Sequence, residues 1–240
     1  MEKKLYLAKT EYCVKYANML PFITPKIMGK HLFTSHWLKD RMEASRLAST
    51  TMNVLVRTRR LIRAKSKDAI YLRLGKDKRI GMQYFFHNQA LNSFLVNLDL
   101  HGYAVKYGGL NEKFPNSDGI LYVDDRHCMG LDPVAIELDT GCHGPLAIHE
   151  QIMKYEKSPF RYILYVTYPT SYYYNGNDEN YEQQSEQEKN LRRKMKTHKI
   201  PKELREKILS TTYAQATDPT RDPLKEKIWR TLNGTYTTVL

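Results

Sequence analysis

Three acidic side chains lie at the ends of two apolar segments in the middle of the chain. Asp118 precedes the segment 119–123, and Glu137 and Asp139 close the segment 133–139. Successive side chains of a strand point to opposite faces, so Glu137 and Asp139 share one face. If the two strands are neighbours, Asp118 joins them. Three carboxylates in one pocket are ligands that Mg²⁺ or Mn²⁺ prefers, so the sequence predicts a divalent-metal site.

Apolar residues at helical and strand spacing surround these acids. In chain order they predict helix, strand, strand, strand, helix and strand between residues 85 and 167, which is an α/β (α+β) fold class. Residues 168–187 are polar and rich in turn residues, and predict an exposed loop. The predicted elements are a helix at 85–100, strands at 103–107, 119–123 and 133–139, a helix at 146–155 and a strand at 162–166.

The positive charge of the chain is concentrated in its first third. The net charge is +12, and residues 1–82 hold 19 Lys and Arg against 6 Asp and Glu, whereas residues 83–178 hold 6 against 11. A basic block beside an acidic one predicts a domain that binds a polyanion next to a separate, metal-dependent domain. Basic surfaces also keep proteins in solution, but so local an imbalance favours nucleic acid as the partner.

The basic block has the pattern of a winged helix-turn-helix. Thr24 followed by Pro25 predicts a helix that runs to about Leu32, and Ser35 predicts the cap of a longer helical pattern. A short strand at 69–74 with a charged turn after it completes the order. In such a domain one helix enters the major groove of DNA, while the wing contacts phosphates.

No carboxylate occurs between Ala44 and Lys67, so the cations there lack local ion-pair partners and favour an external anion. A solvated helix face is the plainer alternative. The predicted DNA contacts in this block and in the wing are Arg57, Arg59, Arg60, Arg63, Lys65, Lys67, Arg73, Lys76 and Lys78.

The order of elements and the placing of the acids resemble the restriction-endonuclease-like, PD-(D/E)xK, nuclease core. More narrowly, the chain resembles the replication-relaxation family of plasmids, phages and conjugative elements. The matching segments are 86–92, 117–121, 135–141 and the helix that holds Lys154. The Glu-x-Asp-x-Gly piece within 135–141 is the most specific of them, and their order carries more information than any one alone.

This resemblance implies a basic winged-helix domain at 1–82, a nuclease-like core at 83–178 and, beyond the matching part, a helical C-terminal extension at 179–240. It implies Asp118, Glu137, Asp139 and Lys154 as catalytic residues, with Asp118, Glu137 and Asp139 as metal ligands. The general nuclease motif has Lys two residues after the strand acid, where this chain has Asp139. Lys154, on the following helix, is placed to substitute for it.

Two functions follow from this reading. One is a Mg²⁺- or Mn²⁺-dependent DNA endonuclease or nickase that acts in plasmid or phage replication or mobilisation. The other is a non-catalytic auxiliary or regulatory factor that binds an origin or operator, as a homodimer, and recruits a relaxase or replication protein. A pure protein-interaction scaffold is a weaker third alternative.

The remaining tyrosines, the cysteines and the apolar runs support weaker predictions. A loop tyrosine among residues 172–174 could attack DNA, but the two-histidine metal motif that relaxases need is absent, which leaves base stacking or a plain loop. Cys13, Cys128 and Cys142 have no ligand or disulfide spacing, so we expect free thiols in a reducing cytoplasm. No apolar run approaches the roughly 20 residues of a membrane helix, so no membrane partner is expected.

Overall fold

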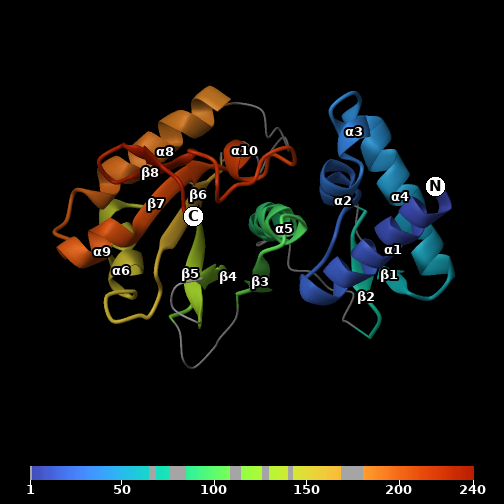
Figure 1. Ribbon diagram of the computed structural model, residues 1–240, viewed down its shortest axis with the longest axis horizontal. Coiled ribbons are helices and arrows are strands. Elements are labelled where there is room, and N and C mark those ends of the chain that lie inside the picture. The colour runs from blue at the N-terminus through green and yellow to red at the C-terminus, as the bar shows by residue number, and fades with distance from the viewer. Residues whose placement is uncertain are drawn as a thin grey trace. The chain divides into compact units, whose positions relative to one another are not determined.

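The chain has a mixed α/β fold that divides into two compact units, Met1–Val96 and Asn97–Leu240 (Figure 1). The computed structural model describes residues 2–64, 69–75, 85–108, 115–125, 130–139, 143–168 and 181–240. The units divide within helix α5 (Phe85–Leu100). The boundary predicted at residues 82 and 83 lies outside the described residues, as do Tyr172, Tyr173, Tyr174, Cys128 and Cys142.

The first unit is a set of helices with a small antiparallel hairpin. Ile23 forms a bridge to Tyr71, which adds an extended residue beside the hairpin. The first helix was not predicted from the sequence, and it packs on the hairpin and on the longest of the other helices. The elements are α1 (Glu2–Met19), α2 (Pro25–Leu32), α3 (Thr34–Trp37), α4 (Arg41–Arg57), β1 (Leu61–Arg63) and β2 (Tyr71–Arg73).

Helix α2 begins as predicted, with the Thr24 hydroxyl accepting the N–H of Ile27 at 3.4 Å. The prediction that Ser35 caps the longer helix is wrong. A short helix, α3, ends at Trp37, and Asp40 caps α4 by accepting the N–H groups of Met42 and Glu43 at 2.9 and 3.1 Å. An Asp carboxylate satisfies two N–H groups and meets the positive end of the helix dipole, so it determines the start of α4.

The C-terminal end of α4 lies within the basic segment, before Arg59, Arg60 and Arg63. The helix ends at Arg57, and Arg59 adopts a left-handed backbone with φ 55°. The N–H of Arg60 donates to the carbonyl of Leu55 at 2.8 Å, which closes the helix in a Schellman motif. Arg63 therefore lies on strand β1. The left-handed backbone conformation of Arg59 costs about 1 kcal/mol relative to glycine at the same position.

The second unit is built on a seven-stranded sheet whose strands are hydrogen-bonded in chain order. The three central strands β5, β6 and β7 are parallel, and the other pairings are antiparallel. The strands are β3 (Ala104–Tyr107), β4 (Gly119–Asp125), β5 (Gly130–Asp139), β6 (Ile163–Thr167), β7 (Ile208–Thr212), β8 (Trp229–Thr231) and β9 (Tyr236–Thr237). The helices are α6 (Pro145–Met153), α8 (Tyr181–Met195), α9 (Lys202–Lys207) and α10 (Tyr213–Ala216).

The order helix, strand, strand, strand, helix, strand predicted for residues 85–167 is confirmed by α5, β3, β4, β5, α6 and β6. The helical C-terminal extension predicted at 179–240 is wrong. That segment contributes the helices α8, α9 and α10, but it also supplies β7, β8 and β9, which continue the same sheet. The segment is therefore part of the core of the second unit.

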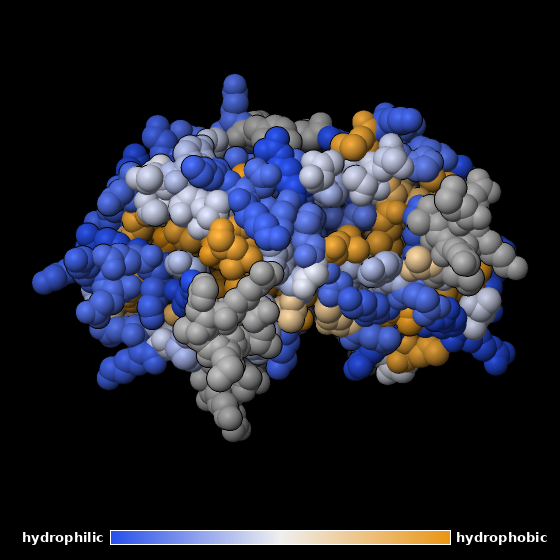
Figure 2. Space-filling model, in the orientation of Figure 1, coloured by the Kyte–Doolittle hydropathy of each residue, from blue (hydrophilic) through white to orange (hydrophobic). Residues whose placement is uncertain are grey.

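Helices α6 and α8 cover one face of this sheet with apolar side chains. Ile148 and Ile152 of α6 and Leu191 of α8 are buried against Ala135 and Ile163 of the central strands. The exposed side chains of α8 are charged, and the surface over this helix is mostly hydrophilic (Figure 2). Within the described part of the chain, no helix combines the length and apolar character needed to cross a membrane.

The close approach of α2 to α4 gives a test of the first unit. A Cβ atom added at Gly29 would lie 2.9 Å from the backbone carbon of Ala44 and 2.9 Å from the backbone nitrogen of Ser45. Backbone cannot rotate away, so we expect Gly29→Ala to lower the free energy of unfolding by roughly 1–3 kcal/mol in urea denaturation. Gly144→Ala, where no atom lies within 4 Å, is the control and should lose roughly 0.5 kcal/mol or less. Equal losses would contradict this account.

Candidate functional site

The buried carboxylate of Glu137 is the centre of the candidate site. Its side chain on β5 is 3% exposed, and both of its oxygens have partners. The Lys154 ammonium lies 2.7 Å from Oε1, and the Tyr155 hydroxyl donates to the same oxygen. The Gln151 amide donates to Oε2 at 2.8 Å. Lys154, predicted as a catalytic residue, is therefore brought into contact with Glu137.

Helix α6 supplies all three of these donors from its last turn and the residue positions just beyond it. Gln151 and Tyr155 are four residues apart, so they lie on the same side of the helix. Lys154 is the C-cap residue, and its ammonium also donates to the carbonyl of Asn116 at 2.6 Å. Tyr155 is fully buried in the apolar layer, which fixes its hydroxyl against Glu137.

Asp118 lies beside Glu137 on the neighbouring strand, as predicted. Gly119 of β4 pairs with Ile136 of β5, and continuing this antiparallel register by one residue places Asp118 next to Glu137. The half-buried Asp118 carboxylate accepts the N–H of Leu138 at 2.8 Å. This hydrogen bond ties the carboxylate to the strand that carries Glu137.

Opposing effects act on the ionisation of Glu137. Burial raises the pKa of its carboxyl, the negative charge of Asp118 raises it further, and Lys154 and Tyr155 lower it by stabilising the ionised form. The result is a pKa of about 7. Burial of the Tyr155 side chain raises the pKa of its hydroxyl, and the negative charge of Glu137 and the hydrogen bond to it raise this pKa further, so the hydroxyl remains a donor.

Asp139 has a different partner from the one that the motif implies. It is 1% exposed and shares a strand face with Glu137, but its Oδ2 lies 3.1 Å from Nδ1 of His143. This hydrogen bond raises the pKa of His143, while partial burial and the charge of Lys194 lower it. Asp139 therefore forms a carboxylate–imidazole pair beside the Glu137 centre.

The donor chemistry suits Mg²⁺ or Mn²⁺, but the arrangement fits such an ion only in part. The described residues contain no group of three His, Cys, Asp or Glu side chains placed to hold a metal. Asp118 and Glu137 are the residues that would hold one. Because protein donors occupy both oxygens of Glu137, an ion there would displace at least one of them.

Tyr165 of β6 is a further polar residue of this region that the sequence did not indicate. It pairs in register with Glu137 and is fully buried, and its hydroxyl has no hydrogen-bond partner among the described residues. Gln151 and Tyr155 were also missed, although their spacing on a predicted helix was a usable signal. Tyr165 gave no signal, because a tyrosine within an apolar strand is ordinary.

The predicted DNA contacts of the first unit are mostly exposed. Four of them are exposed and have no carboxylate partner in the described part of the chain: Arg57, Arg59, Arg63 and Arg73. Arg60 is different, because its guanidinium donates to both oxygens of Glu11 at 2.8 and 2.9 Å. The balancing acid comes from α1, 49 positions away in the sequence from the arginine that it binds. Lys65, Lys67, Lys76 and Lys78 lie outside the described residues.

Helix α4 also exposes a mostly polar face that the sequence analysis did not single out as a whole. Arg46, Thr50, Val54 and Arg57 recur at helical spacing and are exposed. Arg46 donates to Glu43 at 2.7 Å, so its charge is partly balanced. The other side of the helix is buried against α2.

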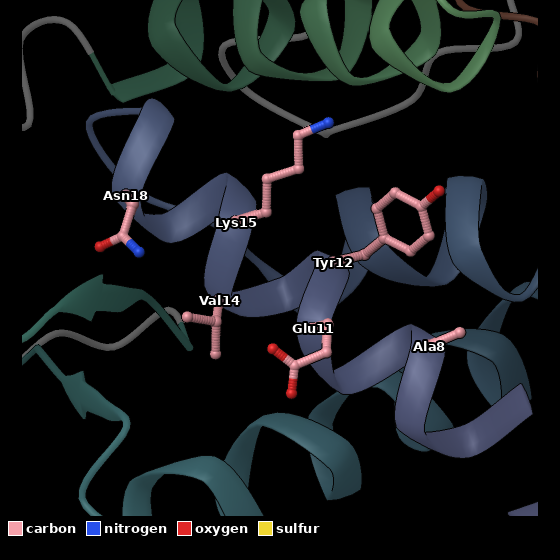
Figure 3. Close-up of a pocket in the computed structure, with 6 residues that line it drawn as sticks. All are labelled: Ala8, Glu11, Tyr12, Val14, Lys15 and Asn18. Carbon is pink, nitrogen blue, oxygen red and sulfur yellow. The ribbon is translucent and has the colours of Figure 1, made fainter. Parts of the chain in front are cut away.

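A separate hollow of about 420 Å³ runs along α1 (Figure 3). Its lining includes Tyr12 and Lys15, whose ammonium lies 5.8 Å from the Tyr12 ring centre. Glu11, which binds Arg60, lies beside them, so the hollow adjoins an ion pair of the basic region. The described lining is Ala8, Glu11, Tyr12, Val14, Lys15 and Asn18.

Geometry therefore defines a class of site: a buried carboxylate held by lysine, tyrosine and glutamine, beside a second acid at the start of the adjacent strand. Comparison with models of protein families, with characterised proteins and with solved structures found no match to this chain. The resemblance to the replication-relaxation family stays a prediction.

Glu137 gives a pH-dependent test of this site. Between pH 4.5 and about 7 the folded protein keeps the Glu137 proton that the unfolded chain loses. The stability from the protonated form is therefore fully present below pH 4.5 and is lost as the pH rises through 7. We expect the free energy of unfolding to fall by on the order of 3 kcal/mol more in the wild type than in Glu137→Gln over this window.

Urea denaturation of both proteins at several pH values measures this difference. Glu156→Gln, which changes an exposed glutamate just beyond α6, is the matched control and should follow the wild type. Parallel pH profiles for the wild type and Glu137→Gln would show that Glu137 is ionised throughout.

Proposed function

We propose that this protein binds DNA through its first unit and that the second unit is a nuclease-like core acting on that DNA. The observation that carries the proposal is the contact of 2.7 Å between Lys154 and the buried Glu137, with Asp118 beside it. Placing two carboxylates together in a partly buried site lowers stability, and such groups occur preferentially where chemistry or binding requires them.

The order of elements supports the nuclease-like core. Asp118 precedes β4, Glu137 and Asp139 lie at the end of β5, and Lys154 ends the following helix. This is the order that the resemblance to PD-(D/E)xK enzymes implies. The departure at Asp139 is accompanied by a lysine that reaches Glu137 from α6, so the site keeps one cation for a phosphate.

The first unit supports DNA as the substrate. Its order of helices followed by a hairpin is that of a winged helix, and α4 exposes a polar face that ends in Arg57. The exposed arginines of the hairpin, Arg63 and Arg73, would contact phosphates. A cytoplasmic protein of a plasmid, phage or conjugative element fits this combination.

In the enzymatic form of the proposal each residue has a defined task. Mg²⁺ or Mn²⁺ held by Asp118 and Glu137 would supply Lewis-acid polarisation of the phosphate and a bound water of lowered pKa. Lys154 would stabilise negative charge on the phosphate oxygens. Tyr155 and Gln151 hold the Glu137 carboxylate in its orientation.

A second candidate function is a non-catalytic factor that binds an origin or operator as a homodimer and recruits a relaxase or replication protein. One observation favours it: protein donors occupy both oxygens of Glu137, which suits a structural role for that carboxylate. The two candidates differ in one measurable property, the cleavage of DNA.

Cleavage of supercoiled plasmid DNA in Mg²⁺ or Mn²⁺ distinguishes them. We expect nicking by the wild type and a loss on the order of 10²–10³-fold in Lys154→Ala, because a donor to the phosphate oxygens is removed. Glu137→Gln should be inactive, and Glu156→Gln should be unchanged. Binding without nicking in either metal would reject the enzyme and leave the auxiliary factor.

A substitution at Arg59 tests DNA contact separately from the stability of the fold. Arg59→Gly places the residue best suited to φ 55° at the end of α4, so the free energy of unfolding should rise by about 1 kcal/mol. The same change removes an exposed charge, so DNA affinity should fall and the salt dependence should decrease by about one phosphate contact. Urea denaturation measures the change in the free energy of unfolding. Filter binding at several salt concentrations measures the DNA affinity and its salt dependence.

Arg59→Lys is the control for this experiment. It keeps the charge and the left-handed backbone, so affinity should stay near that of the wild type. If Arg59→Gly binds DNA as tightly as the wild type, Arg59 is not a contact.

A further inference from the structure

A row of polar side chains crosses one face of the sheet of the second unit. Glu137 of β5 pairs in register with Tyr165 of β6, which in turn pairs with Ser210 of β7. Residues in register on neighbouring strands lie side by side on the same face of a sheet. The row consists of Asp118, Glu137, Tyr165, Ser210, Arg230 and Tyr236.

Tyr165 is fully buried, and its hydroxyl has no hydrogen-bond partner among the described residues. Its neighbours in the row are satisfied: Glu137 accepts from α6, and the Ser210 hydroxyl donates to Glu188 of α8. Hydrogen bonds are also formed by Asp118, Arg230 and Tyr236. A buried hydroxyl without a partner lowers stability, so its presence indicates that it meets a partner in another state of the site.

The surroundings of this hydroxyl are acidic. Burial raises the pKa of the Tyr165 hydroxyl, and the negative charges of Glu137, Asp139 and Asp118 raise it further, with Glu137 having the largest effect of the three. The hydroxyl therefore lies close to these carboxylates, and it can donate one hydrogen bond to an oxygen. Several negative charges together oppose an anion and favour a cation as the ligand of this region.

We propose that Tyr165 is a positioning residue of the candidate site: its hydroxyl donates to the Glu137 carboxylate when a divalent cation on Asp118 and Glu137 displaces Lys154. The ammonium of Lys154 has the same sign of charge as the cation, so the two compete for Oε1 of Glu137. This inference rests on the metal-dependent form of the proposed function. It does not depend on the binding of DNA.

The exchange of donors explains why a tyrosine occupies this position. Glu137 is buried, so loss of the lysine would leave its carboxylate short of a donor unless another one lies within reach. Tyr165, beside it on the next strand, supplies that donor from the sheet, whereas Gln151 continues to hold Oε2 from α6. A purely apolar strand interior would be packed as well by phenylalanine, without the cost of a buried hydroxyl.

The test combines calorimetric titration of the full chain with Mn²⁺, without DNA, and urea denaturation of the metal-free protein. We expect Tyr165→Phe to weaken Mn²⁺ binding by roughly 10-fold, because a group that orients a metal ligand is lost. Its urea midpoint without metal should equal or exceed that of the wild type, because an unpartnered buried hydroxyl is removed. Tyr162→Phe, the same change at a half-buried tyrosine just before β6, is the matched control and should alter neither quantity.

A hydroxyl with a purely structural role gives a different result. In that case Tyr165→Phe has a lower urea midpoint than the wild type or does not fold, and either outcome overturns the inference. A second measurement uses the wild type alone, with tyrosine labelled with ¹³C at Cζ. Addition of Mg²⁺ should shift the Cζ resonance of Tyr165 and leave that of Tyr162 in place, and an unshifted Tyr165 resonance also overturns the inference.

The outcomes also separate this inference from the proposed function. If Glu137→Gln abolishes Mn²⁺ binding while Tyr165→Phe binds Mn²⁺ like the wild type, the metal site stands and the role of Tyr165 is rejected. If the wild type does not bind Mn²⁺, the inference and the metal-dependent form of the proposed function are both rejected.

Discussion

The burial of the Glu137 carboxylate is the constraint on which the second unit depends. A charged or polar group removed from water requires donors, and here they come from a single helix turn and the residues just after it. Helix α6 must therefore end where Lys154 and Tyr155 meet β5, which fixes the crossover between β5 and β6. The apolar contacts of Ile148 and Ile152 hold the helix there. Helix α6 thus contributes both to the apolar packing of the fold and to the donors of the candidate site.

The same constraint makes the site sensitive to its surroundings. Asp118 beside Glu137 adds repulsion, and Lys154 offsets part of it through an ion pair that remains partly exposed. Any ligand that brings positive charge to the acids, or negative charge to the lysine, changes this balance directly. Because a charged ligand would change the electrostatic energy of these three side chains, a site inside a stable core can still respond to binding. The Asp139–His143 pair lies two residues along the strand, with the imidazole exposed at the surface.

Local patterns in the sequence predicted the elements that depend on local interactions. Thr24 and Pro25 began a helix as expected, and the two apolar segments beside Asp118 and Glu137 form the strands β4 and β5, as their patterns indicated. The strands of the last third were missed, because strands of two to five residues are defined by their neighbours in the sheet. The pairing of Arg60 with Glu11 was missed for a similar reason, since the two residues are 49 positions apart. No spacing rule reaches across such a distance.

Two positions remain where the chain departs from what local chemistry prefers. Arg59 takes a backbone conformation that suits glycine, and Asp139 stands where the nuclease motif has lysine. Departures of this kind are expected where function requires a residue that stability does not. Arg59 presents its positive charge at the surface, whereas Asp139 is buried and holds the imidazole of His143 through Nδ1. The proposed contact of Arg59 with DNA phosphate would explain why an arginine occupies a position whose backbone favours glycine.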